Sequence, residues 1–384
     1  MTSPLQGPVD LDDAAALSAA DPGGMLLDIA SSAAQVRAAA SAAAEAGVAS
    51  LAEEGRPRAV VVCGTGASGT AGDLLAAVAG LGAAAPVLTH RGHGLPAWVG
   101  AADLVVAVSC SGTTDETLSA LSEAVRRGCR LLVVAAADSP LAELGARGRA
   151  VVVPVPQGRS PRASVWSLTV PLVLAASAVG VAPVRPEDLE EAAQVLERIA
   201  TRCRPDADAV VNPAKSLATE LSGTLPVVWG SSPLAAAAAS RFVGVLAENA
   251  GAVAAGGALP EARHDQVAVL DGPWAGSGAG GEEDFFRDRL DEPERPELRL
   301  VLLRDLVEHP RVGLQAEAVA DLAAERGVGV SALQAEGTGA LARLAALVGT
   351  TDFASAYLAL LEGTDPTPVP AVTALQQRTG PARS

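Results

Sequence analysis

Two short segments in the first third of the chain share one pattern. Each is an apolar run of β-branched residues, then a turn of small residues, then an alanine- and leucine-rich stretch; the segments are 61–69 and 108–117. Strand–turn–helix units that follow one another predict a parallel sheet with helices on both faces. Each turn also opens a helix, where unpaired N–H groups and the positive end of the helix dipole favour an anion.

The residues of these two turns suit phosphate binding. The second turn places Ser109, Ser111 and Thr114 within one turn of the chain, so that three hydroxyls can converge on one phosphate. The first turn contributes Gly64, Gly66 and Ser68. Because parallel strands end at the same edge of a sheet, where such folds bind ligands, we expect both turns at one site.

The rest of the chain continues the alternation of strands and helices. Expected strands in the first half are 59–63, 86–89, 103–109, 130–135 and 150–155, with helices at 24–54, 69–81, 115–128, 140–147, 164–180 and 186–204. In the second half the expected strands begin at 225, 266, 298 and 328, and the strand that begins at 266 is expected to end at 270. Helices are expected at 233–250, 311–326 and 338–361.

This pattern predicts two α/β domains. We expect an N-terminal extension over 1–24, a first domain with both phosphate turns over 25–185, and a linker helix, second domain and C-terminal segment over 186–384. A segment rich in glycine and charge, 272–297, is expected to be an exposed and mobile insertion.

Charge and cysteine content exclude several classes. The formal net charge of −16 argues against nucleic-acid binding through a basic surface. The four cysteines show no metal-ligand spacing, and we interpret them as buried thiols of a reducing cytosol, with no metal site. The polar, acidic N-terminus does not read as a signal peptide, and we expect neither a membrane span nor membrane binding.

Several segments, in order along 25–375, resemble the bifunctional phosphoglucose/phosphomannose isomerase family of tandem SIS (sugar isomerase) domains. The turn 109–117 matches the family pattern Ser-x-Ser-Gly-(Asn/Thr)-Thr-x-Glu-Thr, and 160–163 resembles its Pro-Arg-Ala segment. Residues 241–250 resemble its Glu-Asn-Ala segment, 259–265 its Pro-Glu-x-x-His segment, and 358–370 its Asp-Pro terminus.

The resemblance implies two flavodoxin-like SIS domains, each a parallel sheet with helices on both faces. It also implies a cytoplasmic homodimer that interconverts glucose 6-phosphate or mannose 6-phosphate with fructose 6-phosphate, without metal or organic cofactor, at sites on the dimer interface. By the same resemblance, Glu248 is the base that forms a cis-enediol, His264 opens the sugar ring, and Arg162 stabilises the enediolate. Gly64, Gly66 and Ser68 would lie beside the sugar, and Ser109, Ser111 and Thr114 would hold the phosphate.

Some positions depart from the family pattern. The usual Gly-Gly-Ser of the first turn is Gly66-Ala67-Ser68, and the family's C-terminal lysine is absent, leaving Arg378 as a substitute. A second hypothesis is therefore a phosphosugar-binding regulatory protein with weak or no catalysis. A glucosamine-6-phosphate synthase is disfavoured because no amidotransferase domain precedes the pattern, and a dehydrogenase because 64–69 lacks the dinucleotide fingerprint.

Overall fold

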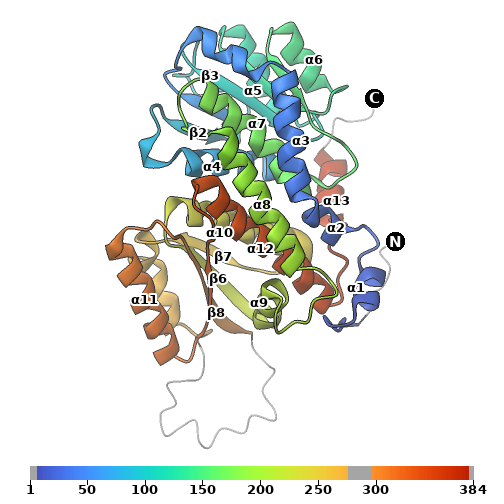
Figure 1. The fold of residues 1–384 in the computed structure, drawn as a ribbon, viewed down its shortest axis with the longest axis vertical. Coiled ribbons are helices and arrows are strands. Elements are labelled where there is room, and N and C mark those ends of the chain that lie inside the picture. Colours follow the sequence, from blue (N-terminus) through green and yellow to red (C-terminus); the bar gives the residue numbers. More distant parts are fainter. Residues whose placement is uncertain (1–6, 276–295, 380–384) are drawn as a thin grey trace, which may run out of the picture.

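The computed structural model describes residues 7–275 and 296–379. Two parallel β-sheets, one in each half of the chain, lie one above the other in Figure 1, with helices around both. This confirms the predicted α/β class with parallel sheets and helices on both faces.

The first sheet has the strand order β2-β1-β3-β4-β5. Its strands are β1 (Val60–Cys63), β2 (Val87–His90), β3 (Leu104–Ser109), β4 (Arg130–Ala135) and β5 (Val151–Pro154). Side chains of neighbouring positions alternate between two apolar layers: Val62 and Val106 pack on one face, and Val61 and Val105 on the other. Both faces are thus buried, which explains why the strands read as continuous apolar runs.

Helices cover both faces of this sheet. On one face lie α4 (Gly66–Ala79) and α7 (Val165–Ala178), and on the other lie α5 (Asp115–Arg126) and α6 (Pro140–Arg147). The chain therefore leaves β1 toward one face and β3, its neighbour in the sheet, toward the other. That change of direction is the topological switch point of this fold, where ligands bind in open α/β sheets.

The second sheet repeats the same topology with one strand fewer. Its order is β7-β6-β8-β9, with β6 (Thr224–Gly230), β7 (Ala255–Ala258), β8 (Glu297–Arg304) and β9 (Gly329–Gln334). One face packs on α10 (Pro233–Val245) and α12 (Ala340–Leu361), and the other on α11 (Pro310–Glu325).

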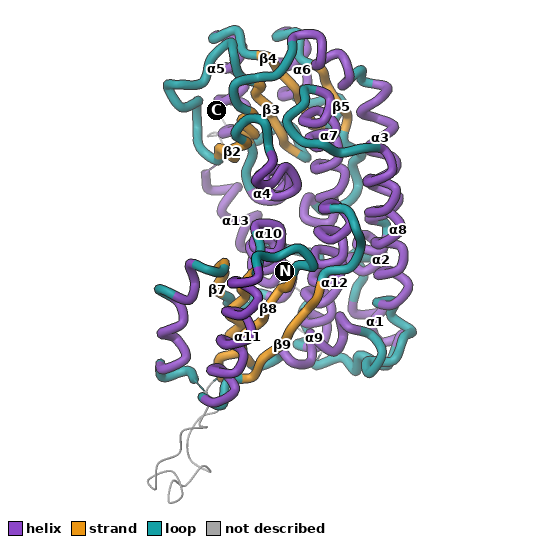
Figure 2. The backbone as a smooth tube through the Cα atoms, turned by 60° about the vertical axis from the view of Figure 1, so that its left-hand side comes forward, coloured by secondary structure: helices purple, strands orange, loops and turns teal. Residues whose placement is uncertain are grey.

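A layer of helices joins the two halves on one side of the molecule (Figure 2). It consists of α2 (Met25–Ala30), α3 (Ser32–Glu45), α7, α8 (Pro186–Arg202), α9 (Pro213–Leu221) and α12. Within it α8 packs against both α3 and α12, and α4 of the first half contacts α10 of the second. One apolar cluster therefore combines helices of both halves with strands of the second sheet, whereas the two faces of the first sheet have apolar clusters of their own.

The segment before α2 packs on the C-terminal half. Val9, Leu11 and Leu17 of this segment, which includes α1 (Ala14–Ala20), are buried in the core shared with α12, and the Val9 N–H donates to Leu360 O at 3.3 Å. The short helix α13 (Pro370–Thr379) is exposed along its whole length.

For the second half, one expected strand is wrong and one strand was not expected. Residues 266–270, expected as a strand, form a 3-10 turn (Gln266–Asp271) in which the Asp265 carboxylate accepts from the Gln266 N–H. The strand that was missed is β7, whose sequence Ala-Gly-Gly-Ala carries no strand signal. Its Gly257 faces Trp229 so closely that a Cβ would lie 2.8 Å from the indole, which explains a glycine in a strand.

Of the described residues, α12 alone forms a helix long and apolar enough to cross a membrane, and 94% of its apolar window is buried inside the protein. The helix α7 is also strongly apolar, and most of its residues are buried. Both are core helices, as their packing in the shared core shows. The predicted insertion 272–297 falls mostly on residues 276–295, which lie outside the described part.

Candidate active site

The turn after β1 lies at the switch point of the first sheet. Gly64 is pressed against the neighbouring strand, since a Cβ there would lie 2.9 Å from Val108 O and 3.0 Å from the Ser68 Cβ. Ser68 is itself buried. Gly66, with φ +53°, is exposed and has open space in front of it. Of the three residues predicted for this turn, Gly66 therefore faces the solvent side, whereas Gly64 and Ser68 shape the turn behind it.

The turn after β3 brings the predicted hydroxyls together. The Ser109 Oγ lies 2.9 Å from the Thr114 Oγ1 and 3.5 Å from the Ser111 Oγ, and it accepts the Gly112 N–H at 3.0 Å. Gly112 has φ +70°, and a Cβ there would lie 2.1 Å from the Ser139 Oγ, so only glycine fits. Three hydroxyls and the N-terminus of α5 thus converge, as phosphate binding requires.

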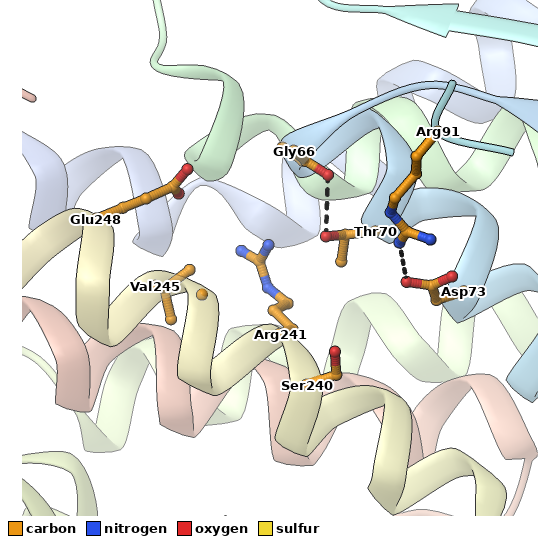
Figure 3. A pocket seen from close by; sticks show the side chains of 10 residues that line it. Gly66, Thr70, Asp73, Arg91, Ser240, Arg241, Val245 and Glu248 are labelled. Atoms are coloured by element: carbon orange, nitrogen blue, oxygen red, sulfur yellow. Dashed lines mark hydrogen bonds and ion pairs between the residues drawn. The ribbon is translucent and has the colours of Figure 1, made fainter. Parts of the chain in front are cut away.

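A pocket of about 200 Å³ lies between α4 and α10, next to the β1 turn (Figure 3). From the first half it is lined by Gly66, Ala67, Thr70, Asp73 and Arg91, and from the second half by Ser240, Arg241, Gly244, Val245 and Glu248. Glu248 and the turn around Gly66 therefore face one space, although they are far apart in the sequence.

Glu248 sits on a single π-helical turn, Leu246–Ala250, that follows α10. The sequence predicted a continuous helix over 233–250, and the wider turn interrupts it while Leu246 and Asn249 stay buried; such turns often occur at functional sites. Burial raises the pKa of the Glu248 carboxyl above its ordinary value, although the positive charges of Arg162 and Arg241 oppose the rise. A carboxylate in such a place is a stronger base than one in water.

Arg162 lies behind the pocket and is 6% exposed. Its Nε donates to Asn249 Oδ1 at 2.5 Å, and its Nη2 donates to Pro366 O at 2.5 Å and to Thr367 O at 2.7 Å. It thereby connects the π turn to the C-terminal segment, and its charge acts on its neighbour Glu248. The structure brings Arg162 and Glu248 together as predicted, but Arg162 does not line the pocket.

Arg241, on α10, does line the pocket. It forms a bidentate pair with Asp352 of α12, at 3.0 Å from Nε and 2.7 Å from Nη2, and its Nη2 also donates to Arg162 O at 2.8 Å. Figure 3 shows the Arg241 guanidinium between Glu248 and Thr70. Sequence reasoning missed its role because an arginine in a helix gives no signal of the buried carboxylate that orients it.

A second ion pair lines the far side of the pocket. Arg91, in the loop after β2, pairs with Asp73 of α4, and its Nε would lie 3.0 Å from a Cβ at Gly69. Sequence reasoning also missed Thr70, Asp73, Arg91 and Ser240 as pocket residues. Asp73 and Thr70 follow Gly66 at helical spacing, so the face of α4 could have identified them.

His264 is exposed and lies outside this pocket. Its neighbours Ala262 and Leu270 pack with Trp229 on one face of the second sheet, whereas α10, which precedes Glu248, packs on the other face. Within one chain His264 therefore does not line the pocket that Glu248 lines.

The switch point of the second sheet, between β6 and β8, is closed by the protein itself. The Asp305 carboxylate, at the end of β8, accepts from the Ser232 Oγ at 2.9 Å and from the Arg343 Nε at 2.7 Å. An internal anion thus occupies the place that corresponds to the hydroxyl turn of the first sheet. Among the described residues no cluster of three or more His, Cys, Asp or Glu side chains could hold a metal ion.

Two parallel sheets of this topology, with a hydroxyl turn at the switch point of the first, are the arrangement that the resemblance to tandem SIS-domain proteins predicts. Residues 210–378 match the family model described as the bacterial phospho-glucose isomerase C-terminal SIS domain.

Curated relatives extend the match over most of the chain. Bifunctional phosphoglucose/phosphomannose isomerases from Caldicellulosiruptor bescii and Aquifex aeolicus are 28% and 29% identical to it, over 83% of this chain and 88% and 89% of theirs. The resemblance to this family predicted from the sequence is confirmed.

Solved structures agree on the fold. A hypothetical protein from Thermus thermophilus has a TM-score of 0.68 at 18% identity, covering 93% of this chain and 91% of its own. A glucose-6-phosphate isomerase like protein from the same organism has a TM-score of 0.57 at 19% identity, covering 97% of this chain and 100% of its own.

Proposed function

We propose that this protein is an aldose–ketose isomerase that interconverts glucose 6-phosphate, mannose 6-phosphate or both with fructose 6-phosphate. The observation that carries the proposal is Glu248, a carboxylate of raised pKa that shares a pocket with the turn at the switch point of the first sheet. The curated relatives named above are isomerases of these sugars, so a purely regulatory phosphosugar-binding protein is not favoured.

In this mechanism the phosphate binds to Ser109, Ser111 and Thr114, and the carbonyl end of the sugar enters the pocket. Glu248 removes the proton next to the carbonyl and returns it to the neighbouring carbon, through a cis-enediol. The negative charge that develops on oxygen is stabilised by the positive field of Arg162 and Arg241, which are held in place by buried partners before substrate arrives.

Ring opening needs a second acid–base group, and His264 is our candidate. Because His264 lies outside the pocket of its own chain, we propose that a second copy of the chain delivers it, in a cytoplasmic homodimer. The exposed position of His264 supports this arrangement, because a residue that serves a partner must lie on the surface of its own chain.

The direct test supplies fructose 6-phosphate to the purified protein and follows glucose 6-phosphate and mannose 6-phosphate separately. We expect at least one product, and its production should stop in the Glu248→Gln variant. Binding of fructose 6-phosphate without either product would instead favour the regulatory function.

A further inference from the structure

The hydroxyl turn after β3 holds no positive side chain of its own. Its three hydroxyls are followed by Asp115 and Glu116 in the first turn of α5, and the whole chain has a formal net charge of −16. A phosphate dianion bound there would meet unfavourable charge unless a nearby cation compensates it.

Most arginines near the site are already engaged. Arg91 pairs with Asp73, Arg241 pairs with Asp352, and Arg162 donates to Asn249 and to backbone carbonyls. Redirecting any of them to a phosphate would break an existing interaction. The cation that serves the phosphate should therefore be one with free donors.

Arg159 meets this condition. Within residues 7–275 and 296–379 its side chain makes neither a hydrogen bond nor an ion pair, and its Nε is shielded from solvent without a partner. The hydroxyl of the next residue, Ser160, is likewise buried and unpartnered. Buried donors without acceptors are costly, so a ligand that offers acceptors to these two consecutive residues would be bound favourably.

The loop that carries Arg159 is fixed to the hydroxyl turn. The Gln157 Nε2 donates to Cys110 O, between Ser109 and Ser111, at 3.0 Å. Arg159 follows Gln157 by two residues in the same loop, and the carbonyl of Ser160 after it accepts from the Ser164 Oγ at 3.0 Å. The positive charge of Arg159 acts on the Cys110 thiol inside the turn, where it opposes the rise in pKa that burial causes.

From this geometry we infer that Arg159, on the loop after β5, supplies the positive charge that binds the substrate phosphate above the Ser109–Ser111–Thr114 turn. The inference rests on the proposed function and adds to it the residue that selects for a dianionic substrate. The ligand chemistry is a phosphate monoester, which a guanidinium can bind with two parallel hydrogen bonds.

A negative charge that would compete with the phosphate for Arg159 is that of Asp28, on α2. It interacts electrostatically with Arg159, but the two do not form an ion pair within 4.0 Å. Asp28 therefore leaves the hydrogen-bond donors of the Arg159 guanidinium unoccupied.

The test compares Arg159→Gln, Arg159→Lys and a matched control, Arg147→Gln, which removes the same charge from an exposed position on α6. Calorimetry gives the Kd of fructose 6-phosphate and of inorganic phosphate, and kinetics give kcat and KM. Arg159→Gln should weaken both affinities about tenfold or more, because a charged hydrogen bond is lost. It should raise KM more than it lowers kcat, and Arg159→Lys should bind with intermediate affinity.

Unchanged affinities in Arg159→Gln, or an equal loss in Arg147→Gln, would overturn the inference. A wild-type protein that isomerises fructose 6-phosphate while Arg159→Gln binds it normally would overturn this inference alone. A wild-type protein that binds phosphate through Arg159 but forms no product would overturn the proposed function and support this inference. Thermal unfolding of all three variants establishes that each is folded.

Discussion

At the scale of the residue, Glu248 illustrates how stability is given up for reactivity. Burial raises the pKa of its carboxyl, so the folded protein holds the ionised form less favourably than the unfolded chain does. When folding raises the pKa of a carboxyl, its cost to the stability of the fold is absent at a pH below the pKa that the carboxyl has in the unfolded chain. This cost grows as the pH rises through the pKa that the carboxyl has in the folded protein. At neutral pH the ionised carboxylate therefore destabilises the fold, and a neutral isostere should relieve this.

We predict that Glu248→Gln abolishes isomerisation and raises Tm at neutral pH, with no gain in Tm at acid pH, where wild-type Glu248 is protonated. In the wild type, kcat/KM should fall as the pH drops through the raised pKa of Glu248, because a protonated carboxyl is no base. The measurements are the pH–rate profile and calorimetric melting at two pH values, with the exposed Glu325→Gln as control. A Tm of Glu248→Gln below that of the wild type at neutral pH would contradict the destabilisation that we assign to the buried Glu248 carboxylate.

The hydroxyl turn gives a second prediction at this scale. Ser111→Ala removes an exposed hydroxyl that contacts Ser109 and Thr113, so the fold should lose little stability. It should lower the affinity for fructose 6-phosphate about tenfold or more, since a hydrogen bond to a charged oxygen is lost. Titration calorimetry measures this, with Ser41→Ala on the exposed face of α3 as control. Equal affinities in the two variants would remove Ser111 from the phosphate site.

At the scale of the element, the sequence predicted most strands of both sheets and both turns of the first switch point. Continuous apolar runs and small-residue turns are local signals, and they identified β1, β3, Gly66 and Ser109. The strand β7 was missed because its glycines are explained by a contact between residues far apart in the sequence, the close approach of Gly257 to Trp229. The strand expected at 266–270 failed because its apolar residues serve a 3-10 turn capped by Asp265.

The pocket was less predictable than the turn for a related reason. Arg241 faces the pocket because Asp352, on another helix, pairs with it. No local sequence pattern predicts a partner so distant in the chain. The resemblance to a family gave Glu248, His264 and Arg162 as candidates, but only the packing of α4 against α10 distinguishes the one that lines the pocket from the two that do not.

The contact between α10 and α12 yields a prediction at this scale. Asp352 is buried, and burial raises the pKa of its carboxyl although Arg241 opposes the rise. Asp352→Ala leaves the Arg241 guanidinium without its partner, which should cost about 3–5 kcal/mol of the free energy of unfolding. Because Arg241 also loses its orientation, kcat/KM should fall as well.

Urea unfolding measures the first effect and kinetics the second, with Asp321→Ala on the exposed side of α11 as control. A variant as stable as this control would show that the pair contributes nothing to the fold. Lost stability with unchanged kcat/KM would show that Arg241 has no part in the reaction.

At the scale of the whole molecule, the two halves are joined too closely to act as independent modules. The N-terminal segment packs on α12, and the Asp12 carboxylate accepts from the Ala209 N–H at 2.7 Å, so residues of the first half of the sequence stabilise the second half. Asp305 and Arg343 close the second switch point, so among the described residues the open hydroxyl turn is the one at the first switch point. A dimer would therefore carry two equivalent sites, related by its two-fold axis.

This arrangement permits a test of where His264 acts. If a site combines Glu248 of one chain with His264 of its partner, the Glu248→Gln and His264→Ala homodimers are each impaired at both sites. A heterodimer of the two has one site with both substitutions and one with neither. After subunit exchange in an equal mixture, half of the dimers should be heterodimers, so the activity should recover to about a quarter of the wild-type value.

Sedimentation at micromolar concentration should give about twice the chain mass for the wild type and both variants. The matched control is the double variant, with both substitutions in one chain, mixed with wild type. Every mixed dimer then lacks one of the two residues at each site. After subunit exchange, the activity of this mixture should therefore fall below its value before exchange. If the single variants exchange subunits but regain no activity, His264 acts within its own chain, which requires a rearrangement of the segment 259–265. A monomer with full activity would show that one chain completes the site.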